Sequence, residues 1–385
     1  MLGLRVVEVF AGIGSQAKAL KNLNIEHEIV AISEWDIHAL ISYAYIHKNE
    51  EMDSVVLPEK SEVINQLSQY TFSTNGKTPV LNIKNIGEKK LFELYKAHKV
   101  TKNIGSISNI LAKQIPDFDL LTYSFPCQAI SLQGKQEGLG KNTGTSSSLL
   151  WEIERILSTL KDEGRLPTFL LMENVANLFS KKFMPFFNTW LEFLNKLGYH
   201  TSYEILNASH FDCPQNRKRA FAVSVLNDKK GGFTFPIGTP TQKNISSILE
   251  QDHISTNLLL PHLEQKLKHK TPTETAIKKS NLHTTLLNNY TTFNSENICY
   301  FDDGVAPTIT ASGAQSRVKI INSKTGSLRY MSACEHLKLM GFEASDYQKL
   351  SKCSYRIGEV TIKKQAGNSI CVPVLEAIFN ALLKN

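Results

Sequence analysis

One cysteine stands where a nucleophile is expected. Cys127 follows an apolar run, residues 119–123, that is typical of a buried strand in a parallel sheet. Pro126 ends that strand, because proline cannot donate a hydrogen bond to the ladder. Ligands of open α/β sheets bind beyond the carboxyl ends of strands, where a half-exposed thiol near backbone N–H groups can ionise. A cysteine is more often a small buried hydrophobe, but the flanking Pro126 and Gln128 favour a nucleophile.

A carboxylate and two arginines are predicted beside this cysteine. A second apolar strand, residues 169–172, delivers Glu173 to the same edge of the sheet. A carboxylate in this place could instead cap the next helix. Arg217 and Arg219 precede another strand and would ordinarily form a solvated face. Beside a cysteine and a glutamate, these cations are suited to hold a phosphate or to polarise a carbonyl oxygen.

A glycine turn near the N-terminus predicts a nucleotide-type cradle. Residues 4–10 read as a strand, residues 11–15 as a tight turn, and Ser15 as the cap of a helix that runs to about residue 23. The turn has only a Gly-x-Gly spacing, so a plain strand-to-helix connection is the alternative. Glu34 and Trp35 end the next strand, residues 27–33, where an acid can bind ribose hydroxyls and a ring can face adenine.

The remaining pattern predicts an α/β fold with two unequal domains. Strands alternate with helical segments, which indicates a doubly wound, Rossmann-like sheet in residues 1–228, completed by residues 360–385. Residues 48–100 read as an insertion that decorates the sheet, and residues 109–113 as helix-like. Residues 229–330 are rich in Lys, Thr, Asn and His and predict a smaller irregular domain, with 331–359 as the return connection.

Composition narrows the class of protein. The 385 residues carry a formal net charge of +7, which suits a polyanionic partner such as nucleic acid. The six cysteines are scattered without metal-ligand spacing, which indicates free thiols in a reducing cytoplasm and no metal site. We expect no membrane association, because we find no signal-peptide pattern and no apolar stretch approaching roughly 20 residues.

These pieces, in this order, resemble the DNA cytosine-5 methyltransferases over nearly the whole chain. The matching segments are Phe10-Ala-Gly-Ile-Gly14, Glu34-Trp35, Ser124-Phe-Pro-Cys127-Gln, Glu173-Asn174-Val175, Gln215-Asn-Arg217-Lys-Arg219, Pro307-Thr-Ile-Thr-Ala-Ser312 and Gly367-Asn368-Ser369. The resemblance implies S-adenosylmethionine as cofactor, without a metal. It assigns the cofactor site to Phe10, Ala11, Gly12, Ile13, Gly14, Glu34, Trp35, Ser106, Ile107, Pro126, Leu150, Asn368 and Ser369.

The resemblance also implies a mechanism and a DNA substrate. The Cys127 thiolate would add to carbon 6 of a flipped-out cytosine, while Glu173 would bind N3 and the amino group and Arg219 the carbonyl oxygen as charge develops. The resemblance also counts Arg217 among the catalytic residues. A side chain of the loop after Cys127 fills the vacated stack in this family, and Gln133 is the candidate here. The implied DNA-binding residues are Gln133, Ser131, Lys135, Ser312, Gln315, Ser316 and Arg317.

A subgroup is indicated as well. Residues 289–297 and 310–317 look like the compact mollicute enzymes that methylate CG, which predicts a short site containing CG. We expect a monomer in the cytoplasm of a bacterial host, or encoded by a phage, with a cognate restriction endonuclease as a candidate partner. One departure is Ser106, where the family usually has an acid that binds the adenine amino group, so weaker cofactor binding is expected.

Three alternatives stay open from the sequence. An RNA cytosine-5 methyltransferase would use the same chemistry but would not need so long a basic region. A catalytically weak DNA-binding protein is disfavoured by intact Cys127, Glu173 and Arg219. A nucleotide-dependent oxidoreductase is disfavoured because the third glycine of the dinucleotide fingerprint is missing.

Overall fold

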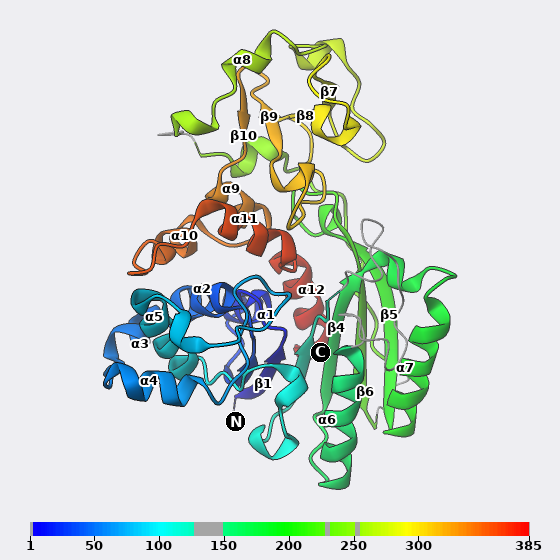
Figure 1. Cartoon of the computed structure of the whole chain (residues 1–385). Coiled ribbons are helices and arrows are strands. Elements are labelled where there is room, and N and C mark those ends of the chain that lie inside the picture. The colour runs from blue at the N-terminus through cyan, green and yellow to red at the C-terminus, as the bar shows by residue number, and fades with distance from the viewer. Residues whose placement is uncertain (1–2, 127–148, 228–231, 251–254, 385) are drawn as a thin grey trace.

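A twisted six-stranded sheet forms the centre of the larger part of the molecule (Figure 1). The computed structural model describes residues 3–126, 149–227, 232–250 and 255–384. The strand order is β2-β1-β3-β4-β6-β5. The strands are β1 (Leu4–Val9), β2 (His27–Ser33), β3 (Leu120–Tyr123), β4 (Phe169–Val175), β5 (Tyr199–Asn207) and β6 (Lys218–Leu226). The predicted α/β class is confirmed.

The first four strands are parallel, and the last two form a hairpin-like pair. β1 pairs in parallel with β2 and β3, and β3 with β4, as the near-continuous apolar runs predict. β6 runs antiparallel to both β4 and β5, so the sheet is mixed rather than wholly parallel. β2 has the predicted bounds, whereas β1 ends one residue early because Phe10 takes a φ of 57°.

Alternate residues of the strands enter two separate cores. On β1, Val6 joins one apolar cluster, while Val7 and Val9 join the other. One face is covered by α1 (Ser15–Asn22), α2 (Ile37–His47) and α12 (Val372–Leu383). The other is covered by α6 (Leu150–Asp162) and α7 (Met184–Lys196), whose Trp190 is fully buried. Helices on both faces give the doubly wound arrangement.

Two local predictions in the N-terminal half need correction. Ser15 does not cap α1: the cap is Gly14 in a left-handed conformation, without a side-chain hydrogen bond. The helix expected at 109–113 is replaced by two short 3₁₀ turns, at Ile107–Asn109 and Ala112–Gln114. The segment 48–100 contains α3 (Asn49–Ser54), α4 (Lys60–Leu67) and α5 (Glu88–Val100). Its buried leucines pack with α2 in the first core, so this segment extends the body of the protein.

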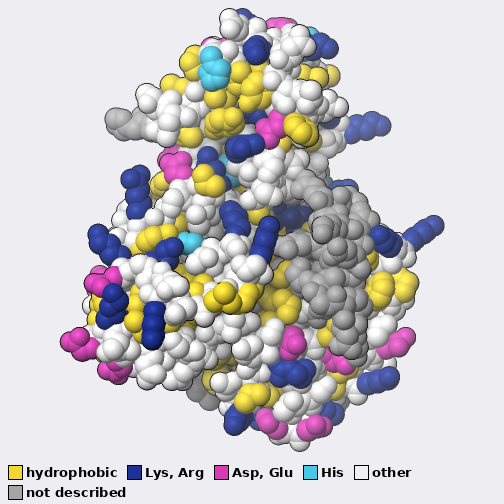
Figure 2. Space-filling model, viewed as in Figure 1, with side chains coloured by type: hydrophobic (Ala, Val, Ile, Leu, Met, Phe, Trp, Pro, Cys, Tyr) yellow, Lys and Arg dark blue, Asp and Glu magenta, His cyan; other side chains and the backbone are white. Residues whose placement is uncertain are grey.

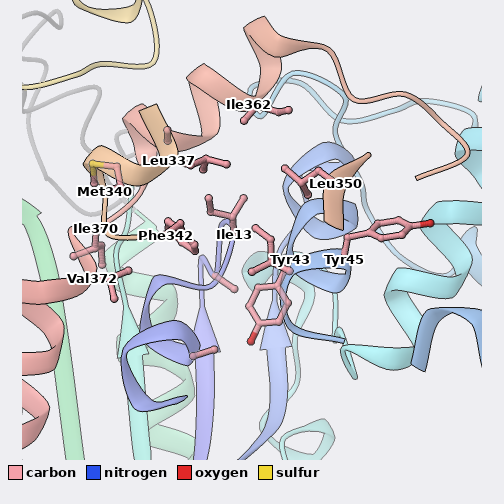
Figure 3. Close-up of a cluster of buried hydrophobic side chains, with 14 of the residues drawn as sticks. Ile13, Tyr43, Tyr45, Leu337, Met340, Phe342, Leu350, Ile362, Ile370 and Val372 are labelled. Carbon is pink, nitrogen blue, oxygen red and sulfur yellow. The ribbon is translucent and has the colours of Figure 1, made fainter. Parts of the chain in front are cut away.

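The C-terminal part packs against the turn that follows β1. Residues 331–359, expected only as a connection, contain α9 (Ala333–Leu339) and α10 (Ala344–Leu350), followed by α11 (Glu359–Asn368). Figure 3 shows Leu337, Met340 and Phe342 from this part converging with Ile13 and with Tyr43 of α2. α12 begins with a proline in its first turn, where the missing N–H costs no hydrogen bond.

A second, smaller sheet lies beyond α9 and α11 (Figure 1). Its order is β10-β9-β8-β7, and it has its own apolar cluster around Phe301 and Leu328. The strands are β7 (Thr284–Leu286), β8 (Ile298–Phe301), β9 (Lys319–Ile321) and β10 (Leu328–Tyr330), with helix α8 (Pro261–Glu264) beside them. This sheet falls in the region for which the composition predicts a separate unit, and the boundaries of the two domains stay a prediction.

One stretch, Glu359–Leu383, is long and apolar enough to span a membrane by length and composition alone. No apolar stretch of this length is expected from the sequence. Of its most apolar window, 56% is buried inside the protein, as in the core helix of a soluble protein. The stretch is also two helices, because α11 ends at Asn368 and α12 begins at Val372.

Replacing Gly367 by alanine should destabilise the protein. A Cβ on this residue of α11 would lie 2.4 Å from the carbonyl carbon of Thr310 and 2.6 Å from the amide nitrogen of Ala311. Backbone atoms cannot move aside cheaply, so we expect a cost of about 1–3 kcal/mol. The measurement is the apparent melting temperature of the purified full-length variant.

Gly358→Ala is the matched control, because an added Cβ at this N-cap of the same helix meets nothing within 4 Å. Equal melting temperatures for Gly367→Ala, Gly358→Ala and the unaltered protein would show that the close approach to Thr310 does not constrain the fold.

Candidate active site

The strand order creates a topological switch point at the carboxyl ends of β1 and β3. The chain leaves β1 for β2 on one side and comes back to β3 on the other side of β1. The connections after β1 and β3 therefore diverge, which is where open α/β sheets bind ligands. The glycine turn follows β1, and Ser124, Phe125 and Pro126 follow β3. Cys127, the predicted nucleophile, lies outside the described residues.

The Glu173 carboxylate is held by neighbours on both sides. It is 6% exposed and stands near the end of β4. The Arg219 Nε lies 3.2 Å from its Oε1, and the Ser124 hydroxyl donates to its Oε2 at 2.5 Å. The antiparallel register explains the ion pair, because Val175 opposite Arg219 puts Glu173 on the diagonal of the same face. The structure thus brings together the predicted acid and one predicted arginine, and adds Ser124.

Asn174 fixes the segment that leads to Cys127. Its side-chain amide donates to the Phe125 carbonyl oxygen at 3.0 Å, and its own oxygen accepts from the Val175 N–H at 2.8 Å. Asn174 is 1% exposed, so these bonds are made away from water, where leaving them unmade is costly. This residue ties the end of β3 to the end of β4. Its position next to Glu173 in the sequence was the only signal for such a role.

Arg217 does something different from Arg219. Its guanidinium is 2% exposed and donates to the carbonyl oxygens of Ile309 at 2.8 Å, Gly367 at 3.0 Å and Ser369 at 2.8 Å. Its Nε has no hydrogen-bond partner among the described residues. Burial lowers the pKa of Arg217 to about 9, with a further contribution from the charge of Arg219. These contacts make Arg217 a tie between three backbone segments, a role that its predicted place beside Arg219 did not indicate.

The turn after β1 needs its glycines. Phe10, Gly12 and Gly14 all have positive φ, at 57°, 58° and 79°. A Cβ on Gly14 would lie 2.4 Å from the His47 Nε2, which bonds the Ile13 carbonyl oxygen at 2.9 Å. A Cβ on Gly12 would meet nothing within 4 Å, so this side of the turn is open. An open glycine backbone at a sheet's ligand edge is suited to close approach by a ligand.

Glu34 is bonded to that turn. Its carboxylate accepts from the Gly12 N–H at 2.8 Å and from the Asp36 N–H at 2.7 Å. The Asn103 side chain bonds both the N–H and the carbonyl oxygen of Glu34, at 3.0 Å each. Burial raises the pKa of Glu34 to about 7, and the charge of Asp36 contributes to this rise. This role of Asn103 could not be predicted from the sequence, because its local pattern gives no sign of a partner 69 residues away.

The other predicted cofactor residues differ in their exposure. Ala11 and Ile13 are buried within the turn, and Ile107 and Leu150 are buried in the second core. Those that keep exposed atoms are Trp35, Ser106, Pro126 and Asn368. Ser369 is buried, and its hydroxyl donates to the Gln365 carbonyl oxygen at 2.8 Å.

The predicted DNA-binding residues divide into two groups. Gln133, Ser131 and Lys135 lie outside the described residues. Ser312 and Arg317 are exposed, and Gln315 and Ser316 are half-buried, in the segment between the large body and the second sheet. Lys and Arg side chains are visible on this face where the two parts meet (Figure 2). Within the described ranges, no three His, Cys, Asp or Glu side chains gather to hold a metal ion.

Comparisons with known proteins agree with this geometry. Residues 69–384 match the model of the C-5 cytosine-specific DNA methylases. The orphan methyltransferase M.SssI of Spiroplasma monobiae is 40% identical, over 98% of this chain and 97% of its own length. The type II methyltransferase M2.ScrFI of Lactococcus lactis subsp. cremoris is 36% identical, over 99% of each. The predicted family resemblance is confirmed.

Solved structures show the same fold. The Dnmt2 methyltransferase of S. pombe aligns with a TM-score of 0.62 at 20% identity, covering 99% of this chain and 98% of that chain. The methyltransferase EhMeth of Entamoeba histolytica aligns with a TM-score of 0.56 at 15% identity, covering 100% and 99%. At these identities the likeness establishes the architecture alone.

The raised pKa of Glu34 should appear in the pH dependence of stability. Between the ordinary carboxyl pKa of 4.5 and the folded value of about 7, the folded protein binds a proton that the unfolded chain has released. The free energy of unfolding should therefore fall as pH rises through this window. Glu34→Gln keeps an acceptor for the Gly12 N–H but cannot ionise. We expect its melting temperature to fall less than that of the unaltered protein between about pH 5 and about pH 8.

Glu192→Gln, on the exposed face of α7, is the control for removing one charge. If the curves of Glu34→Gln and the unaltered protein stay parallel across this range, burial does not raise the pKa of Glu34.

Proposed function

This chain belongs to the C-5 cytosine-specific DNA methylase family, and we propose that it transfers a methyl group from S-adenosylmethionine to carbon 5 of a flipped-out cytosine in duplex DNA. The observation that supports this most is the Glu173 carboxylate, held between Ser124 and Arg219 at the strand end that leads to Cys127. A carboxylate and a guanidinium at one sheet edge offer both kinds of group that a cytosine ring needs as it gains charge.

The proposed roles follow from the chemistry of each group. The Cys127 thiolate adds to carbon 6 of the ring and makes carbon 5 nucleophilic. Glu173 binds N3 and the amino group, and Arg219 donates to the carbonyl oxygen on which negative charge develops. Once carbon 5 carries the methyl group, loss of the carbon-5 proton expels the thiolate and restores the aromatic ring. In our proposal Arg217 supports this site by holding the backbone rather than by touching the base.

The turn after β1 fits the proposed cofactor. Gly12 has an open backbone, and the Glu34 carboxylate beside it can accept hydrogen bonds from the two ribose hydroxyls. The Ser106 hydroxyl is available to the adenine, as a weaker partner than the acid usual in the family. Bound S-adenosylmethionine supplies an electrophilic methyl group on a sulfonium sulfur. The other residues proposed to bind it are Phe10, Ala11, Ile13, Gly14, Trp35, Ile107, Pro126, Leu150, Asn368 and Ser369.

The second sheet is our proposed target-recognition domain. We assign it to residues 229–330, with DNA lying between it and the catalytic body of residues 1–228 and 360–385. The exposed segment at 312–317 supports this, because it joins the two parts. The segments 289–297 and 310–317 support a short site containing CG, because they resemble those of the compact mollicute enzymes that methylate CG. We further propose a cytoplasmic monomer, with a restriction endonuclease as candidate partner.

The first test is base-resolution 5-methylcytosine sequencing of plasmid DNA from cells that express the protein. We expect methylation at one short motif, and its complete loss in Cys127→Ala, because this change removes the proposed nucleophile and the other five cysteines are buried. Binding of S-adenosylmethionine, measured by calorimetry, should persist in this variant.

Full methylation by Cys127→Ala would exclude the covalent mechanism. Absence of DNA methylation by a folded, cofactor-binding protein would instead point to the RNA substrate, and sequencing of cellular RNA for 5-methylcytosine would then locate it.

A second test separates the roles of the two arginines. Arg219→Lys should lower kcat by roughly 10²-fold, because a lysine cannot keep the paired geometry toward Glu173 and the base. Its melting temperature should change little, since Arg219 lies at a strand entrance. Arg217→Lys should lower the melting temperature, because a lysine cannot reach three carbonyl oxygens. The opposite pattern in kcat and melting temperature would reverse the two assignments.

A further inference from the structure

Three charged residues meet at the edge of the second sheet. Glu296 comes from the 3₁₀ turn Asn294–Asn297, Lys319 begins β9, and Arg317 follows the 3₁₀ turn Ala314–Ser316. The Arg317 Nη2 donates to the Glu296 Oε1 at 2.7 Å. The Lys319 ammonium donates to the Glu296 carbonyl oxygen at 2.8 Å and lies 3.4 Å from its Oε2. One carboxylate thus serves two cations.

Lys319 fixes Glu296 from inside the protein. Its side chain is 2% exposed, and its ammonium lies 5.4 Å from the ring centre of Tyr290 and 5.6 Å from that of Tyr330. A buried ammonium needs a carboxylate or carbonyl partner, and Glu296 supplies both. Burial alone would raise the pKa of Glu296, but the hydrogen bond from Arg317 and the charge of Lys319 lower it. The carboxylate is therefore charged and held in place.

Arg317 lies at the outer end of this arrangement. Its side chain is 60% exposed, and only one of its terminal nitrogens bonds Glu296. With so much of the side chain exposed, its other N–H groups are accessible to a ligand. The segment that carries it is tied to the catalytic body, because Arg217 bonds the Ile309 carbonyl oxygen and Gly367 packs on Thr310. A ligand bound by Arg317 is thereby placed at a defined position relative to the catalytic strands.

The pairing with a carboxylate favours one class of ligand over another. A phosphate is best bound by an unpaired positive charge, and Glu296 reduces the charge that a phosphate would meet. A guanine edge needs two donors in a fixed plane, and an arginine whose plane is held by a carboxylate offers them to O6 and N7. Fixing the plane beforehand also lowers the entropy lost on binding.

We propose that Glu296, anchored by the buried Lys319, is a positioning residue that holds Arg317 for recognition of a guanine in the target site. This proposal deepens the proposed function, since it names the residues by which the second sheet selects DNA sequence. Lys319 and Glu296 act through Arg317 and do not themselves touch the base.

The test is selection of bound duplexes from a random-sequence DNA library, followed by sequencing, with the full-length protein and its variants. Glu296→Gln keeps the size of the side chain but loses its charge. We expect its preference for guanine at one position to fall roughly 10-fold, with preferences at other positions unchanged. Arg317→Lys, which leaves the buried pair intact, should lose preference at the same position. Glu274→Gln, which removes an exposed ion pair with His269 in the same region, is the matched control.

Each outcome of the selection experiment either supports the proposal or overturns it. If Arg317→Lys binds all DNA sequences more weakly to the same degree, and its affinity depends less on salt, then Arg317 contacts a phosphate. This result would overturn the proposal. An unchanged guanine preference in Glu296→Gln with a native melting temperature would overturn it as well. Because selection needs no methyl transfer, guanine selection by a protein that methylates no DNA would leave the proposal standing while contradicting the proposed function.

Discussion

The buried guanidinium of Arg217 is the interaction on which the arrangement of the parts depends. It joins the strand next to Glu173 and β4 to two other segments, through the carbonyl oxygens of Ile309, Gly367 and Ser369. A charge 2% exposed with only neutral acceptors is expensive unless several hydrogen bonds are made at once. All three acceptors must therefore be in position together. The start of β6, the segment leading to the second sheet and the turn before α12 are thus fixed as one unit.

A buried ion pair forms a second junction, between the second sheet and α9. Arg329, in β10, donates to both carboxylate oxygens of Glu335 in α9, at 2.8 and 2.6 Å. Glu335 also accepts from the backbone N–H groups of Ser332 and Glu250, so each of its oxygens is used twice. Burying an ion pair is compensated only by such complete hydrogen bonding. The two junctions explain why the second sheet, with a small core of its own, can present residues 312–317 in a fixed relation to Glu173.

The larger sheet could be predicted because its signals are local. Apolar runs mark β1, β2, β3, β4 and β6, whereas β5 contains mostly polar residues. Glu173, Arg219 and the glycine turn all stand at ends of such runs. The second sheet could not be predicted in detail, because strands of three or four residues, such as β7 and β9, are too short to show alternation. Ser15 failed as a cap because the positive φ of Gly14 already sets the start of α1. Partners far apart in sequence, such as Glu34 with Asn103, leave no local signal at all.

The two arginines that are proposed to contact a base, Arg219 and Arg317, are each paired with a carboxylate. Arg219 is paired with the nearly buried Glu173, and Arg317 with the partly buried Glu296. In both pairs the carboxylate is held by a second donor, Ser124 in one and Lys319 in the other. A free arginine explores many rotamers, and that freedom would be lost at the moment of binding. A carboxylate that is itself fixed removes the freedom beforehand, so the guanidinium meets its target already oriented. The acids beside the two arginines therefore lower the net positive charge of the protein, and with it the non-specific attraction to DNA. In return they fix the orientation of the two guanidinium groups.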